Sequence, residues 1–87
     1  MNIYEKLILK IWSYLDKLGN DEEFKKNCPN ITPQEYLIAK ANPDIKPRRL
    51  INILNGKVKR ITLAELVIIS RVLRIDLVKL FKDEEEE

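Results

Sequence analysis

Helix start and stop signals recur along this chain and divide it into short segments. Thr32-Pro33-Gln34-Glu35 and Thr62-Leu63-Ala64-Glu65 each place a threonine three residues before a glutamate, the pattern of a helix capping box. Pro47 suits the first position of a helix, and Gly56 suits the residue just past a helix end, where φ is positive. No stretch alternates strictly between apolar and polar residues, as a half-buried strand would. These features predict an all-α fold in a single small domain.

Apolar residues at helical spacing place the segments more closely. The spacing and the breaks predict five to six helices in a compact bundle, over residues 2–18, 21–27, 33–41, 47–55, 63–73 and 77–82. The helix that begins at Leu63 is apolar nearly all round, so we expect it to be the central buried helix.

The first helix carries two apolar stripes. This width predicts either packing against two neighbours within the monomer or an interface with another subunit. One stripe holds Ile3, Leu7, Ile11, Tyr14 or Leu15, and Leu18, and the second holds Tyr4, Ile8 and Trp12.

Charge and composition divide the chain into three regions. Residues 1–31 hold the N-terminal helix and a short inserted helix, residues 32–82 hold the core of the domain, and residues 83–87 form an acidic tail expected to be disordered. Residues 1–82 carry 16 basic and 9 acidic side chains, a net charge of +7, whereas the tail carries five acidic side chains. A basic body beside an acidic tail favours a polyanionic partner.

The residue inventory excludes several kinds of chemistry. The chain has no histidine and one cysteine, Cys28, which rules out histidine-based triads, zinc sites and an internal disulfide. We find no glycine-rich phosphate loop and no paired acid site, so we expect no enzyme activity, no catalytic residue, no metal, no cofactor and no small-molecule substrate. No apolar run approaches the ~20 residues that a membrane span needs, and one unpaired cysteine suits the cytoplasm.

The most basic segment of the chain is residues 46–60, with six positive charges and no negative one. Its apolar positions, 50, 53 and 54, predict an inward face, which leaves Arg48, Arg49 and Asn52 to point elsewhere. Guanidinium and carboxamide groups make paired hydrogen bonds to guanine and adenine edges in the major groove. The basic residues that follow, Lys57, Lys59 and Arg60, suit contacts with DNA phosphates.

Residues 32–81 resemble the Cro/C1-type helix-turn-helix domain of phage repressors and related bacterial regulators. The motifs that carry the resemblance are Pro33-Gln34-Glu35-Tyr36-Leu37, Leu50-Ile51-Asn52-Ile53-Leu54-Asn55-Gly56-Lys57-Val58-Lys59-Arg60, Thr62-Leu63-Ala64-Glu65-Leu66 and Leu77-Val78-Lys79-Leu80-Phe81. The resemblance implies a lambda repressor-like fold and a cytoplasmic, repressor-type transcriptional regulator that binds specific double-stranded DNA. It also implies a homodimer, because two copies read a pseudo-palindrome.

The resemblance also implies roles for individual residues. Base reading falls to Arg48, Arg49 and Asn52, and phosphate binding falls to Gln34, Lys46, Asn55, Lys57, Lys59 and Arg60. The chain departs from the family at several positions, including the following three. The turn between the helices at 33–41 and 47–55 is about two residues longer than is usual in the family, counted back from Gly56. Pro47 replaces a polar base reader. Arg74 stands where a glycine usually ends the family's fourth helix, here the helix at 63–73.

A different function on the same scaffold is the alternative. The chain would then be a protein-interaction module, such as an antitoxin or an antagonist of another regulator, with weak or no DNA binding. Its surface for the protein partner would consist of Ile51, Leu54 and the second apolar stripe of the first helix. A stable complex with a protein partner that survives Arg48→Ala would favour this alternative.

Overall fold

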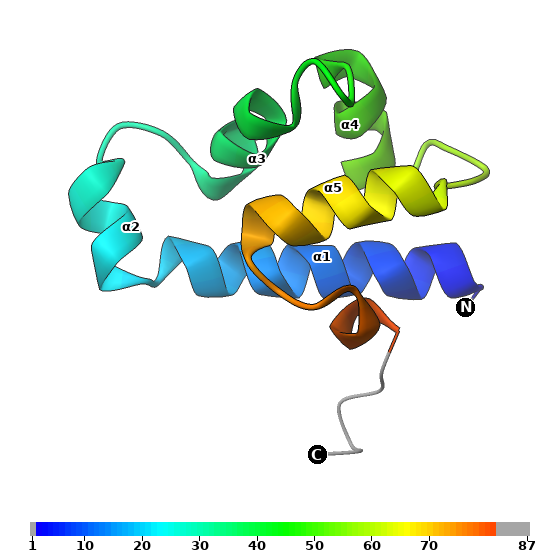
Figure 1. Ribbon diagram of the computed structural model, residues 1–87, viewed down its shortest axis with the longest axis horizontal. Helices are drawn as coiled ribbons and strands as arrows, with labels where there is room; N and C mark the ends of the chain where they lie inside the picture. The colour runs from blue at the N-terminus through cyan, green and yellow to red at the C-terminus, as the bar shows by residue number, and fades with distance from the viewer. Residues whose placement is uncertain (1, 82–87) are drawn as a thin grey trace.

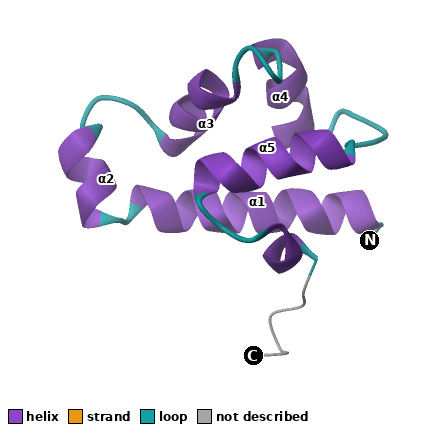
Figure 2. Ribbon diagram, in the orientation of Figure 1, coloured by secondary structure: helices purple, strands orange, loops and turns teal. Residues whose placement is uncertain are grey.

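The computed structural model of the protein describes residues 2–81, so the predicted acidic tail lies outside the described residues. This part of the chain is helical and contains no strand, which confirms the all-α class (Figures 1 and 2). The α-helices are α1 (Ile3–Gly19), α2 (Glu22–Asn27), α3 (Pro33–Ala41), α4 (Pro47–Leu54) and α5 (Leu63–Leu73), and a short 3₁₀ helix, η1 (Leu77–Leu80), follows them.

The long helix α1 supports the rest of the bundle. In Figure 1, α5 lies along α1, α3 and α4 lie above this pair, and η1 lies on the other side of α1. Helix α3 packs against α1, α4 and α5, and α4 also contacts α1. Helix α2 joins the end of α1 to α3 and buries Phe24, whose ring meets the Tyr36 ring edge-on at a centroid distance of 5.4 Å.

Local hydrogen bonds fix where the helices begin. Thr32 and Thr62 each accept the backbone N–H of the glutamate three residues on, and that glutamate accepts the threonine N–H, so both predicted capping boxes are present. Asn2 and Glu5 form a third box at the start of α1. These bonds satisfy N–H groups that the first turn of a helix leaves without an internal partner. The last predicted helix, residues 77–82, is instead the single 3₁₀ turn of η1.

One apolar core joins α1, α3, α4, α5 and η1. Both stripes of α1 contribute to this core, because Leu7, Ile8, Ile11 and Leu15 are buried, whereas Ile3 at the start of the first stripe is 57% exposed. The helix predicted to be central, α5, buries Leu66, Ile69 and Ser70, whereas Leu63 at its start is 62% exposed. Among the helices of residues 2–81, none combines the length and apolar character needed to cross a bilayer.

Candidate nucleic-acid interface

Helix α4 is bounded as the sequence predicts. Pro47 occupies its first turn, and Gly56, with φ of 72°, lies just beyond its end. The N–H groups of Gly56 and Lys57 donate back to the carbonyls of Ile53 and Asn52, at 3.1 and 2.9 Å. This pair of bonds is a Schellman motif, which reverses the chain direction sharply. The basic residues after Gly56 are thereby held close to the last turn of α4.

The burial pattern of α4 separates an inner face from an outer one. Leu50, Ile53 and Leu54 are buried against the core. The opposite side, which we call the outer face, presents polar groups and one apolar side chain. It consists of Arg48 and Asn55, which are exposed, Asn52, which is half-exposed, and Ile51, which is 43% exposed. Arg48 and Asn52 are one helical turn apart, so their side chains share this face as predicted.

Residues 57–60, which we call the basic turn, follow the outer face directly. Lys57, Lys59 and Arg60 are exposed, whereas Val58 between them is half-buried and packs against the core. The next residue, Ile61, is buried. Two apolar anchors therefore hold the backbone of the turn while its three cationic side chains remain in solvent, as the sequence led us to expect for phosphate contacts.

Arg49 has a different environment from Arg48. Its Nε donates to Oε2 of Glu65 at 2.8 Å, and its Nη2 donates to Oε1 of Glu65 at 3.0 Å and to the carbonyl of Arg60 at 2.8 Å. Because Glu65 also accepts the N–H of Thr62, its carboxylate joins α4, the basic turn and the start of α5. We call this arrangement the Arg49–Glu65 clamp. The sequence placed Arg49 among the base readers and gave Glu65 a capping role alone, so their pairing was not predicted.

The clamp changes the acid–base properties of both partners. The side-chain hydrogen bond from Arg49 lowers the pKa of Glu65 below its ordinary value, despite an opposing effect of burial. The same hydrogen bond raises the pKa of Arg49. Both shifts favour the charged forms, so the ion pair and its hydrogen bonds stabilise each other at neutral pH.

Trp12 fixes the other end of α4. Its indole Nε1 donates to the backbone carbonyl of Leu54 at 2.9 Å, which gives a partner to one of the carbonyls that a helix end leaves free. Since Trp12 lies on α1, this bond ties the last turn of α4 to the long helix. The sequence predicted only an apolar role for Trp12.

The connection between α3 and α4 is also fixed. Ile45 is buried, and its N–H donates to the carbonyl of Ala41 at 2.8 Å. Lys46, the N-cap residue of α4, is exposed and makes no side-chain capping bond. Its ammonium group therefore lies in solvent at the start of α4, near the first residues of the outer face.

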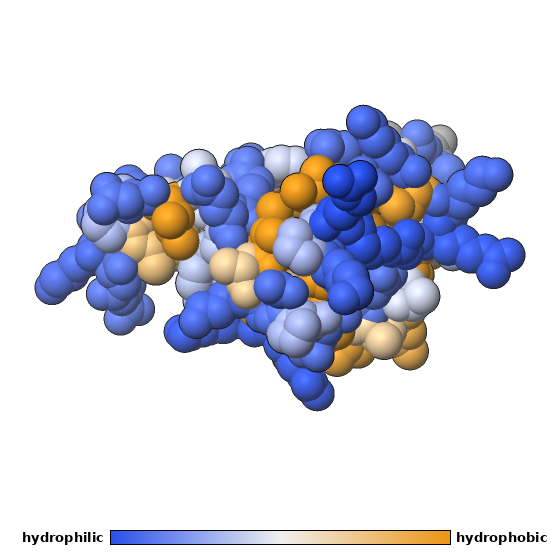
Figure 3. Space-filling model, turned by 90° about the horizontal axis from the view of Figure 1, so that it is seen from above, coloured by the Kyte–Doolittle hydropathy of each residue, from blue (hydrophilic) through white to orange (hydrophobic). Residues whose placement is uncertain are grey.

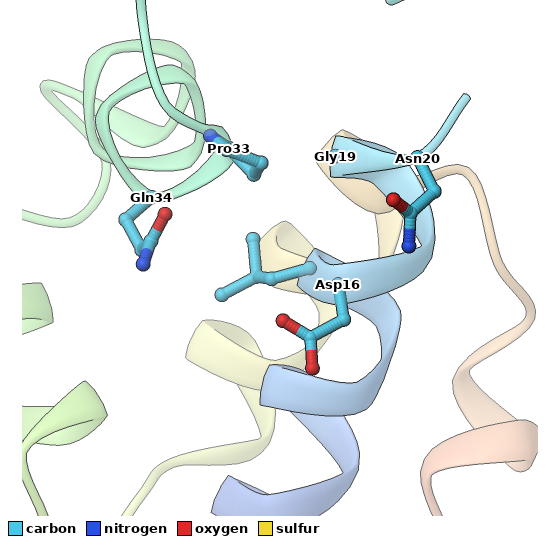
Figure 4. A pocket seen from close by; sticks show the side chains of 6 residues that line it. Asp16, Gly19, Asn20, Pro33 and Gln34 are labelled. Carbon is cyan, nitrogen blue, oxygen red and sulfur yellow. The ribbon is translucent and has the colours of Figure 1, made fainter. Parts of the chain in front are cut away.

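Gln34 lies farther along the bundle, in a pocket between the end of α1 and the start of α3 (Figure 4). Asp16 of α1 lines the same pocket, so a carboxylate lies near the side chain that was predicted to bind a phosphate. The other residues that line the pocket are Leu15, Gly19, Asn20 and Pro33. Gln34 is thus set apart from the outer face of α4 and from the basic turn.

Part of the surface predicted for a protein partner is buried in the core. Leu54 is only 6% exposed, Ile8 is buried, and the Trp12 N–H is bonded within the monomer. Of the residues expected there, Ile51 is exposed and Tyr4 and Trp12 are half-buried against the core. Two of the five side chains in the predicted surface, Leu54 and Ile8, are therefore withdrawn from solvent.

The side of the molecule formed by α3 and α4 is largely hydrophilic. Seen from that side, polar and charged side chains cover most of the surface, with smaller hydrophobic areas between them (Figure 3).

Comparisons with models of protein families, with curated proteins and with solved structures found no match to this chain.

Proposed function

We propose that this protein is a DNA-binding transcriptional regulator of the repressor type, which inserts α4 into the major groove. The observation that carries the proposal is the outer face of α4, where exposed Arg48 and half-exposed Asn52 point away from the core beside the basic turn. An α-helix fits the major groove, and these two side-chain types recognise guanine and adenine there. In this proposal, α3, residues 42–46 and α4 act as the helix-turn-helix.

The Arg49–Glu65 clamp supports the proposal by joining the two kinds of contact. Bases are read by α4, whereas the basic turn binds the phosphates on either side. Because Arg49 bonds both Glu65 and the Arg60 carbonyl, the two elements are held as one unit. We therefore assign Arg49 to positioning rather than to base reading. Arg48 and Asn52 remain the base readers, and the phosphate ligands are Lys46, Asn55, Lys57, Lys59 and Arg60.

Gln34 is a more distant phosphate ligand in this proposal. The start of α3 offers backbone N–H groups as well as the carboxamide, and helix N-termini favour phosphates. Asp16 in the same pocket opposes an anion there. We therefore expect Gln34 to contribute less to affinity than any lysine of the basic turn.

Two copies of the chain are needed for a specific site of useful length, because one helix reads only a few base pairs. A homodimer would place two α4 helices in successive major grooves, about one helical turn of DNA apart. The proposal therefore includes a pseudo-palindromic operator.

The test is selection of bound fragments from a random pool of duplex DNA, with the mass of the complex measured by light scattering. We expect one enriched pseudo-palindrome bound by two chains. Variants Arg48→Ala and Lys25→Ala are matched by the loss of one positive charge, and Lys25 lies on α2, away from α4. Arg48→Ala should lose the preference at one base pair of each half-site, and Lys25→Ala should retain it. Enrichment of no sequence, or equal binding by both variants, would contradict the proposal.

A further inference from the structure

Ile51 is an apolar residue on a face that is otherwise polar. It is 43% exposed, although the inner face of α4 already supplies three buried side chains to the core. Arg48 precedes it by three residues and Asn55 follows it by four, so both lie next to it on the helix surface. Ile51 therefore presents a methyl-rich surface between two hydrogen-bonding side chains.

The Arg49–Glu65 clamp determines which neighbours Ile51 has. Arg49 is bonded toward α5 and the basic turn, so its guanidinium does not cover Ile51. The groups that flank Ile51 are the ones assigned to the bases and to the phosphates. A ligand that contacts Arg48 from the outer face therefore lies next to Ile51.

The major groove offers one apolar group to such a side chain. Among the four bases only thymine carries a C5-methyl group there, and apolar side chains discriminate it by contact. Three residues of helix advance about 4.5 Å along the axis, which is close to one base-pair step of about 3.4 Å. Ile51 is therefore spaced to meet the base pair next to the one that Arg48 contacts.

We infer that Ile51 is a specificity-determining residue that packs against a thymine methyl group, one base pair from the guanine read by Arg48. This inference rests on the proposed function and adds a base to the predicted half-site. It gives a role in base recognition to Ile51, whose side chain has no hydrogen-bonding group.

The experiment replaces each thymine of the enriched duplex in turn by deoxyuridine, which removes the methyl group and keeps the base pair. At one position in each half-site, we expect wild-type protein to bind about fourfold more weakly, the size expected for one methyl group returned to water. Ile51→Ala should bind the thymine duplex more weakly than wild type does. It should also bind the thymine and deoxyuridine duplexes equally well.

The control is Ile31→Ala, which removes the same atoms from a side chain that is 42% exposed and lies before α3. This variant should keep the fourfold preference for thymine. Wild-type binding that ignores every deoxyuridine, or an Ile51→Ala variant that keeps the preference, would overturn the inference and leave DNA binding intact. Failure of the wild-type protein to enrich any duplex would instead remove the proposed function and this inference together.

Discussion

Within residues 2–81, two residues adopt a left-handed backbone, and only one of them is glycine. Gly56 has φ of 72° after α4, and Arg74 has φ of 60° after α5. Arg74 ends α5 with the Schellman motif that also ends α4. Its N–H donates to the carbonyl of Arg71, and the N–H of Ile75 donates to the carbonyl of Ser70. A side chain with a Cβ costs about 1–2 kcal/mol in this conformation, so α5 ends under strain that α4 does not carry.

Arg74→Gly should stabilise the protein by about 0.5–1 kcal/mol. The substitution relieves the left-handed strain, and the greater freedom of glycine in the unfolded chain offsets part of the gain. Urea denaturation would measure it as a higher midpoint at an unchanged slope. Arg74→Ala is the control, because it removes the same charge and keeps the Cβ. Equal stability of the two variants would contradict the explanation by strain.

Arg48→Ala should weaken binding to the selected duplex by about 1–3 kcal/mol and relax the preference at one base pair. The reason is the loss of a guanidinium that pairs with guanine from the outer face of α4. Binding curves against the duplex and its single-base variants would measure both effects. Uniform weakening on all sequences would show that Arg48 contacts the backbone instead.

At the level of elements, helix ends were predictable and helix contacts were not. Capping boxes, Pro47 and Gly56 act within a few residues, so the sequence alone placed α3, α4 and α5 closely. The Arg49–Glu65 pair spans 16 positions and the Trp12–Leu54 bond spans 42. Such bonds depend on the angles between packed helices, which periodicity does not give. For the same reason, the outward direction of Arg48 followed from spacing, whereas the capture of Arg49 did not.

Glu65→Gln should destabilise the protein by about 1 kcal/mol at pH 7, because it removes the charge from the clamp. The lowered pKa of Glu65 means that its contribution is complete above its ordinary value of 4.5. The contribution is lost as the pH falls through the lower pKa of the folded state. The difference between wild type and variant, measured by urea denaturation, should therefore shrink as the pH falls below 4.5.

The control for this prediction is Glu35→Gln. Glu35 accepts the N–H of Thr32 in a capping box of the same kind, and no ion pair of Glu35 is found within residues 2–81. Its effect should be smaller, because the substitution separates no ion pair. An effect of Glu35→Gln as large as that of Glu65→Gln would assign the stability to capping and not to the clamp.

At the scale of the whole molecule, charge is distributed unevenly. Cationic side chains gather in the basic turn and at the start of α4, whereas residues 83–87 carry five acidic side chains. The positive region would attract any polyanion, so affinity alone does not establish specificity. The dependence of binding affinity on salt concentration distinguishes contacts with phosphates from contacts with bases.

Lys57→Ala should weaken binding to all duplexes alike and reduce the slope of log affinity against log salt by about one unit. Its side chain is exposed, and its backbone N–H, which closes the α4 end, is unchanged by the substitution. Titrations at several salt concentrations, with Lys25→Ala as the matched charge control, would measure the slope. An unchanged slope, or a loss confined to one sequence, would exclude a phosphate contact by Lys57.

The bond between Trp12 and Leu54 has a practical consequence. The chain contains one tryptophan, and its indole N–H is hydrogen-bonded to the last turn of α4. Intrinsic fluorescence therefore reports from a single, defined place in the fold. A shift of its emission on addition of a ligand would register displacement of α4 relative to α1, without any dye or label attached to the protein.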